Sequence, residues 1–167
     1  MNKSMRIGLL FFFLLFLQVF VLNNILFLGY INPYLYVAFV IFYPLKEERY
    51  TFLFLSFLLG LSIDFFTDSG GIHALSLLSV AFIRLFLVHV IFKKTPQDYL
   101  FFNLHSEPFG KVFNYVLILT FVHHFILFSL INFSFNNFNN VLLNTLYSGI
   151  FTSLLFFLGT YIIRKKQ

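Results

Sequence analysis

Residues 60–75, GLSIDFFTDSGGIHAL, are the stretch around which the rest of the chain is organised. They place a carboxylate, Asp64, inside an otherwise apolar segment, and the polar turn TDSGG (67–71) follows it. His73 then opens the next apolar run. A charged side chain at the centre of a bilayer costs about 2.5–3.5 kcal/mol on insertion scales. Asp64 therefore needs a structural or functional reason to be there.

The composition is that of a membrane protein. Of the 167 residues, 60% are hydrophobic and 10% are charged, whereas soluble domains carry about 25% charged residues. The chain has no cysteine, so it forms no disulfide and no thiolate site. A net charge of +5 suggests nucleic acid in a soluble protein. Here the basic residues stand at the ends of apolar runs, where membrane orientation requires them, and we expect no nucleic-acid partner.

Six apolar runs separated by polar stretches predict one all-α domain, residues 1–167, with six transmembrane helices. The first run is longer than the apolar region of a signal peptide, and no small-residue cleavage site follows it, so we expect a retained helix. The second run is short, because residues 34–45 reach only about 18 Å as a helix. The predicted helices cover about residues 7–28, 31–45, 50–66, 72–92, 112–131 and 141–163.

The basic residues decide whether the second run crosses the bilayer. With six crossings and an internal N-terminus, ten of the eleven lysines and arginines lie inside, and the eleventh, Arg84, lies within a helix. If the second run failed to cross, eight of those ten would lie outside, against the positive-inside rule. We therefore expect both termini in the cytoplasm. The second run would reach across by using flanking residues or by local bilayer thinning.

Three residues of the third predicted helix, Ser56, Gly60 and Asp64, are spaced by four and share one face. Small residues at this spacing allow close helix contact in lipid, so we expect this face to pack against protein. Asp64 is either a binding or ion-coupling carboxylate or a structural one. In the structural interpretation, which we favour, it accepts hydrogen bonds from the amides of Gly70 and Gly71 or caps the fourth helix at its N-terminus.

The other ionisable residues inside the helices are Arg84 and histidines. Arg84 lies about 18 Å below the outer start of its helix, too deep for a salt bridge with Asp64 unless its side chain extends fully outward. Its partner is an internal acceptor, the cytoplasmic surface or the carboxylate of another protein. His123 and His124 point about 100° apart, so both do not bind one metal in the usual way.

One of these histidines, with His73 and Asp64, could form a metal or proton site, but metal sites need three or four converging ligands. We expect hydrogen-bonded interhelical histidines, with no metal and no cofactor. The sequence has no P-loop, GxGxxG, HExxH or GxSxG motif. It therefore gives no support for an enzyme, and we predict no catalytic residue.

Two stretches carry a family resemblance: LGYINPYLYVAFVIFYPL (28–45) and FLLGLSIDFFTDSGGIHAL (57–75). They contain a proline after the first helix (Pro33), a G-x-x-x-D in the third (Gly60 with Asp64) and a small-residue turn with glycine before the fourth (69–71). In this order they resemble the rod shape-determining protein MreD family, in its Bacteroidetes-type form. The Arg84 region and FVHHFILF (121–128) also look like this subgroup.

The resemblance implies a non-enzymatic scaffold of the cell-wall elongation machinery in the bacterial cytoplasmic (inner) membrane. MreD-like proteins bind MreC and help position peptidoglycan biosynthesis to maintain rod cell shape. They work with the MreB filament, the RodA glycosyltransferase and its transpeptidase. Their architecture is similar to the substrate-binding subunits of energy-coupling-factor transporters. We expect the Ser56–Gly60 face to contact the transmembrane helix of MreC.

That fold similarity also supplies an alternative, a small-molecule, vitamin-type binding subunit of a transporter. Asp64, His73, His124 and Asn144 would line its pocket near the outer surface. Against it, the predicted outer loops are short or featureless. Proton or ion translocation through Asp64, His73 and His123 is a third possibility, but the sequence lacks a chain of ionisable groups through the membrane.

Overall fold

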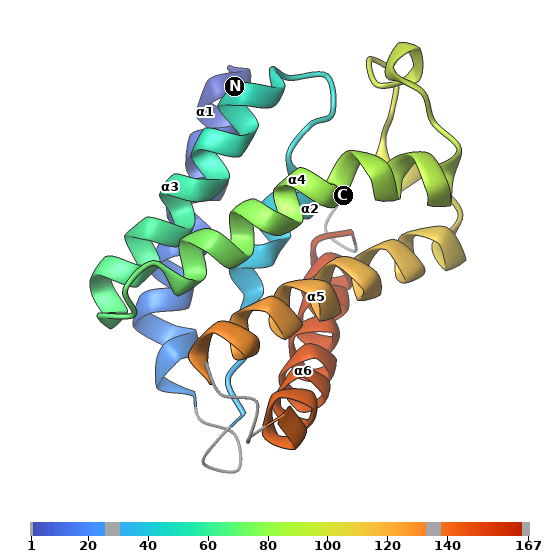
Figure 1. The fold of residues 1–167 in the computed structure, drawn as a ribbon. Helices are drawn as coiled ribbons and strands as arrows, with labels where there is room; N and C mark the ends of the chain where they lie inside the picture. The colour runs from blue at the N-terminus through green and yellow to red at the C-terminus, as the bar shows by residue number, and fades with distance from the viewer. Residues whose placement is uncertain (1, 26–30, 133–137, 165–167) are drawn as a thin grey trace.

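The structure, a computed structural model, describes residues 2–25, 31–132 and 138–164. All regular elements in these ranges are helical. The α-helices are α1 (Lys3–Phe16), α2 (Ala38–Phe42), α3 (Arg49–Thr67), α4 (Ile72–Phe92), α5 (Phe109–Ile131) and α6 (Phe138–Arg164) (Figure 1).

Five of the helical segments are long and apolar enough to cross a membrane. One of them is α1, which continues through a π turn (Leu17–Val21) and a 3-10 turn (Leu22–Asn24), so that the helical segment covers Lys3–Asn24. The others are α3, α4, α5 and α6. The predicted class, an all-α multi-pass membrane protein, is confirmed at this level.

The predicted helix over residues 31–45 is wrong in extent. Only Leu35–Val37, a 3-10 turn, and α2 are helical there. Two prolines explain the difference, because proline has no N–H to donate and disfavours helical geometry in the residue before it. Pro33 precedes the helical turn, and Tyr43, the residue before Pro44, has the extended ψ of 131°. We call residues 31–45 the central segment.

The other predicted bounds are close. Helix α4 has the predicted limits, whereas α5 and α6 each begin three residues before the predicted start. The first helical segment ends at Asn24, and residues 26–28 of its predicted range lie outside the described residues. Between α4 and α5 the polar stretch folds into two short 3-10 helices, Pro96–Asp98 and Leu104–Ser106.

The turn between α3 and α4 requires left-handed backbone geometry. Asp68, Gly70 and Gly71 have φ values of 52°, 66° and 94°, a region that glycine adopts without strain. A Cβ atom added to either glycine would meet nothing within 4 Å. Backbone conformation, rather than space, therefore calls for Gly70 and Gly71.

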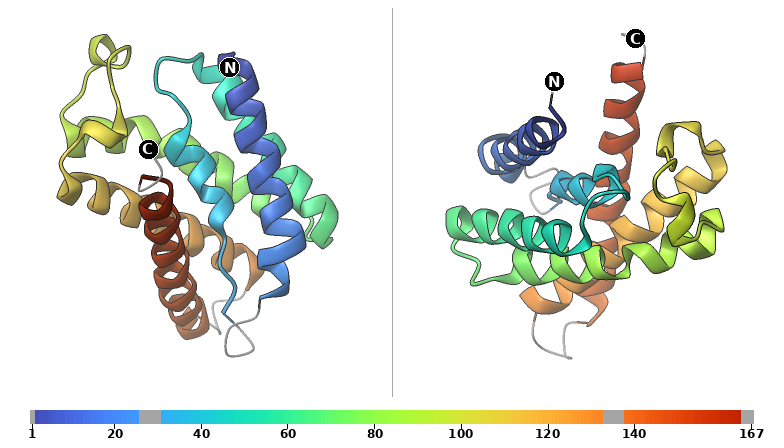
Figure 2. Two further views of the ribbon diagram at one scale, coloured as in Figure 1. Left: turned by 180° about the vertical axis from the view of Figure 1, so that it is seen from behind. Right: turned by 90° about the horizontal axis from the view of Figure 1, so that it is seen from above.

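The central segment runs through the middle of the molecule. In Figures 1 and 2, α1 and α3 lie on one side of it and α6 lies on the other, while α4 and α5 pass across. Consecutive long helices α3 and α4, α4 and α5, and α5 and α6 pack against each other. The start of α1 and the 43–48 loop lie toward the top of Figure 1, and the α3–α4 turn toward the bottom.

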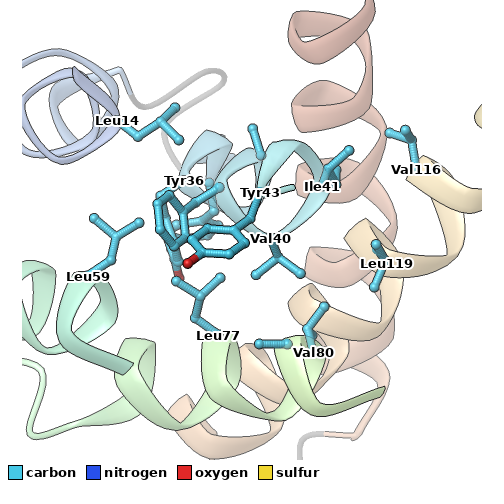
Figure 3. Packing of buried hydrophobic residues seen from close by; sticks show 14 of the residues in the cluster. Leu14, Tyr36, Val40, Ile41, Tyr43, Leu59, Leu77, Val80, Val116 and Leu119 are labelled. Carbon is cyan, nitrogen blue, oxygen red and sulfur yellow. The ribbon is translucent and has the colours of Figure 1, made fainter. Parts of the chain in front are cut away.

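The most deeply buried apolar side chains belong to this short segment. Tyr36, Phe39 and Val40 are fully buried. Figure 3 shows side chains of four long helices pointing at the segment, among them Leu14, Leu59, Leu77, Val80 and Leu119. Large apolar side chains on the outer faces of the long helices are exposed, as expected for surfaces that face lipid; examples are Phe13, Phe65 and Phe86.

Candidate functional site

Asp64 caps the N-terminus of α4. Its side chain is 3% exposed. Oδ1 accepts a hydrogen bond from the backbone N–H of His73 at 2.9 Å, and Oδ2 accepts one from that of Ala74 at 2.8 Å. The hydroxyl of Ser69 also donates to Oδ1. The first N–H groups of a helix have no partner within it and favour negative charge. The capping interpretation of Asp64 is confirmed, with donors in α4 itself rather than in the preceding glycines.

The face formed by Ser56, Gly60 and Asp64 lies inside the protein. A Cβ atom on Gly60 would stand 2.5 Å from the Cα of Ala74 and 2.6 Å from the carbonyl oxygen of His73. Ser56 is fully buried and donates to the carbonyl of Phe52 at 2.8 Å. The expectation that this face binds MreC is therefore wrong, because α4 of the same chain occupies it. The spacing predicts a close helix contact but does not say which helix makes it.

Gln18 and Thr152 satisfy the backbone of the central segment where it is not helical. Gln18, fully buried in the π turn after α1, donates from Nε2 to the carbonyl of Pro33 and accepts from the N–H of Leu35, both at 3.0 Å. Thr152 of α6 accepts from the N–H of Tyr34 at 3.0 Å. Irregular backbone is tolerated at membrane depth only where the protein buries it and supplies such partners.

The three buried histidines surround Tyr34 and Tyr36. The Nδ1 atom of His73 lies 2.7 Å from the hydroxyl of Tyr36. The ring of His123 packs edge-on against the ring of Tyr36, with the centroids 5.0 Å apart. The ring of His124 packs in the same manner against Tyr34, at 5.5 Å. The structure thus brings the predicted histidines together around the central segment, although they come from α4 and α5.

The contacts of His124 fix its tautomer. Its Nδ1 atom lies 2.7 Å from the carbonyl oxygen of Thr120, and a carbonyl only accepts, so we assign the proton to Nδ1. Nε2 then accepts from the hydroxyl of Thr152 at 3.0 Å, while that same hydroxyl accepts from the N–H of Tyr34. His124 is therefore a neutral link between α5, α6 and the central segment.

Arg84 holds the other end of the central segment. Nη2 donates to the carbonyl of Tyr43, the residue at which α2 ends, and Nε donates to the hydroxyl of Tyr115 at 3.2 Å. Its guanidinium lies 4.9 Å from the ring centroid of Phe52. Among the residues that the structure describes, Arg84 has no carboxylate within 4.0 Å, Asp64 included. The structure thus shows internal acceptors as partners of Arg84.

These contacts form a polar framework around the central segment, which we define as Gln18, Tyr36, His73, Arg84, His124 and Thr152. Sequence analysis singled out three of these residues for other reasons and did not assign a role to Gln18, Tyr36 or Thr152. Gln18 stands alone in an apolar run, which is a usable signal. Its partners, in contrast, lie 15 and 17 residues away in a segment expected to be helical.

Hydrogen bonding is less complete on α5 and α6. Several buried side-chain atoms there have no hydrogen-bond partner in the described part of the chain, and these are Thr120 Oγ1, His123 Nε2, Thr145 Oγ1, Ser148 Oγ and Ser153 Oγ. The described residues also contain no group of three or more His, Cys, Asp or Glu side chains that could hold a metal ion. The arrangement thus supports a structural role for the polar framework.

Two cavities are present, and both lie away from the histidines. One, of about 350 Å³, lies between α1 and α3, and the other, of about 280 Å³, lies beside Arg84. Neither is lined by Asp64, His73 or His124.

The fold and these contacts define the class, a multi-pass all-α membrane protein built around a buried, broken segment. No protein-family model, curated protein or solved structure matches the chain.

Proposed function

We propose that the protein is a non-enzymatic scaffold of bacterial cell-wall elongation, of the MreD type. It binds MreC and helps position peptidoglycan synthesis, in one complex with the MreB filament, RodA and its transpeptidase. The resemblance of residues 28–45, 57–75 and 121–128 supports this proposal. One structural observation favours a scaffold over a ligand-binding subunit: Asp64, His73 and His124 all bond to the chain itself.

In the proposed topology all six segments cross the inner membrane and both termini are cytoplasmic. Successive segments alternate in direction in Figure 1, which supports this arrangement. The central segment is short as a helix, but an extended residue covers about 3.3 Å and a helical one only 1.5 Å. With its flanks extended, it reaches at most about 35 Å, more than the roughly 30 Å hydrocarbon core.

The groove between α1 and α3 is the surface that we assign to the single transmembrane helix of MreC. Ser4 and Gly8 line it four residues apart, together with Phe11, Leu55 and Leu58. A Cβ atom added to Gly8 would meet nothing within 4 Å, so space remains beside it. Small residues at this spacing let a second helix approach closely. Unlike the Gly60 face, this one is not covered by another helix of the same chain.

Affinity purification from mild-detergent membranes tests the proposal, with the protein tagged after Gln167 and the co-eluting partners identified. We expect an MreC-like protein together with RodA and its transpeptidase. Gly8→Leu should reduce recovery of the MreC-like protein, whereas Gly159→Leu on α6, where an added Cβ also meets nothing, should not. Recovery of a transporter ATPase pair with its coupling subunit would contradict the scaffold function.

The vitamin-binding alternative makes a different prediction. Its proposed pocket residues Asp64, His73 and His124 are already hydrogen-bonded within the chain. Heating the purified protein with candidate vitamins separates the two functions, because a ligand present at 100 times its Kd stabilises by about 2.7 kcal/mol. We expect no such stabilisation; a clear rise in Tm with one vitamin would replace the scaffold proposal.

A further inference from the structure

The 280 Å³ cavity lies where the end of the central segment, the start of α3, the middle of α4 and the polar 93–108 stretch meet. Arg84 lines it from α4 and Arg49 from α3, and Tyr99 reaches it from the polar stretch. Much of the remaining lining is apolar and includes Phe52, Ala81 and Leu85. The cavity therefore combines two cationic side chains with apolar walls.

Arg84 has hydrogen-bonding capacity that the chain does not use. A guanidinium carries five N–H donors, and the described contacts engage Nε, with Tyr115, and Nη2, with Tyr43. Nη1 has no acceptor among the residues that the structure describes. The side chain is only 3% exposed, and a buried cation without an anion is costly. This end of Arg84 is suited to an anionic ligand.

The mouth of the cavity lies at the edge of the apolar surface. The guanidinium of Arg49 is exposed and stands 5.3 Å from the ring centroid of Phe82, which is 62% exposed on the outside of α4. A charged group over an outward-facing apolar ring is typical of the boundary between hydrocarbon and water. An amphiphile fits this position better than a fully water-soluble ion does.

The charges that face the cavity favour an anion. Arg49 and Arg84 stand against one carboxylate, Glu47. The Oε1 atom of Glu47 lies 3.9 Å from Nζ of Lys3 on the α1 side, which offsets part of its negative charge. The lining is thus net positive, with the deeper arginine held in place by Tyr43 and Tyr115.

We propose that this cavity binds the phosphate headgroup of an anionic membrane phospholipid. Arg84 and Arg49 contact the phosphate, which a guanidinium binds through paired N–H donors. Basic pockets between transmembrane helices on the cytoplasmic side suit lipid headgroups. The cavity lies just below the roughly 300–1,000 Å³ of sites that enclose a whole small molecule. It therefore holds a headgroup while the acyl chains extend along the outer face of α4. This site is independent of the proposed scaffold function.

Native mass spectrometry of the full-length protein in detergent tests the site, with phosphatidylglycerol, phosphatidylcholine and inorganic phosphate as probes. We expect one phosphatidylglycerol retained in preference to phosphatidylcholine, and no competition from millimolar phosphate. Ala81→Leu fills the cavity and leaves every charge in place, so it should weaken phosphatidylglycerol binding by about tenfold or more. Arg49→Gln removes one charge-assisted contact and should weaken it by about tenfold.

Lys46→Gln is the matched control, because Lys46 is an exposed basic residue of the same loop that does not line the cavity. It should bind phosphatidylglycerol as the wild type does. Arg84→Gln also removes a hydrogen bond to the central segment, so its melting curve without lipid is recorded beside its binding.

Three results would overturn the proposal: wild-type binding by Ala81→Leu, an equal loss in Lys46→Gln, or displacement of the lipid by phosphate. The last would identify a soluble anion as the ligand. Recovery of Arg84 in contact with the carboxylate of a co-purified protein would also overturn it.

Discussion

The five long helices and the central segment differ in how their backbones are satisfied. A long helix pairs its own N–H and C=O groups and can therefore face lipid with apolar side chains. The central segment is mostly buried and only partly helical. Its unpaired backbone groups at Pro33, Leu35 and Tyr43 bond to side chains from α1 and α4. The difference teaches that polar residues in this membrane protein serve the segment that lacks a regular ladder.

Gln18→Leu breaks this comparison with the largest expected effect. It leaves the carbonyl of Pro33 and the N–H of Leu35 buried without partners, which should cost about 2–6 kcal/mol of unfolding free energy. Asn24→Leu is the matched control, because Asn24 is exposed and only donates to Phe20 in its own helical segment. Denaturant titration in mixed micelles measures both; equal losses would contradict a special role for Gln18.

Asp64→Asn tests the same principle at a long helix whose first turn needs an external acceptor. An amide has one acceptor oxygen, and its NH₂ group would face an N–H of α4, so we expect a loss of about 2–4 kcal/mol. Asp68→Asn should change little, since Asp68 is exposed and asparagine tolerates its left-handed backbone. A stability loss at Asp68 as large as at Asp64 would count against the cap.

Thr152→Val and Thr145→Val sharpen the comparison within α6. Thr152 bonds both Tyr34 and His124, and its loss should cost about 1–3 kcal/mol. The hydroxyl of Thr145 is buried with no partner in the described residues, so its replacement by a methyl group should be neutral or stabilising. Melting temperatures of the two variants, recorded side by side, decide; the reverse order would contradict the assigned contacts.

The smallest effect is expected in the polar stretch outside the helices. Hydrogen bonds from the backbone and hydroxyl of Thr95 hold the pKa of Asp98 below its usual value, with Lys94 adding to the effect. A lowered carboxyl pKa means that this local capping box is intact above pH 3.8 and is lost as the pH falls through the folded-state pKa. Exchange of the Thr95 amide between pH 6 and pH 2 measures this, and Asp98→Asn should remove the pH dependence.

Sequence reasoning succeeded where the physics is local. Apolar runs predicted the helices, with the limits of α4 as observed, and the Asp64 cap joins residues nine and ten apart in the chain. It failed where partners are distant. The bond from Tyr34 to Thr152 joins residues 118 apart, which no single-sequence periodicity reveals. Pro33 and Pro44 were visible signals, and they limit helix formation in the central segment.

Small-residue spacing predicted contact without naming the partner helix. Gly60 packs against α4, whereas Gly8, a less conspicuous glycine, has open space beside it. Only the arrangement of helices separates these two cases.

Amide hydrogen exchange at Tyr34 and Leu35, in the protein reconstituted in lipid nanodiscs, tests the central claim most directly. Both amides should be strongly protected in the wild type, because side chains of other helices accept their hydrogen bonds. Gln18→Leu should release Leu35 first, and Thr152→Val should release Tyr34 first. Wild-type exchange as fast as at exposed Leu100 and Phe101, or protection unchanged in both variants, would contradict the claim that these side chains hold the central segment.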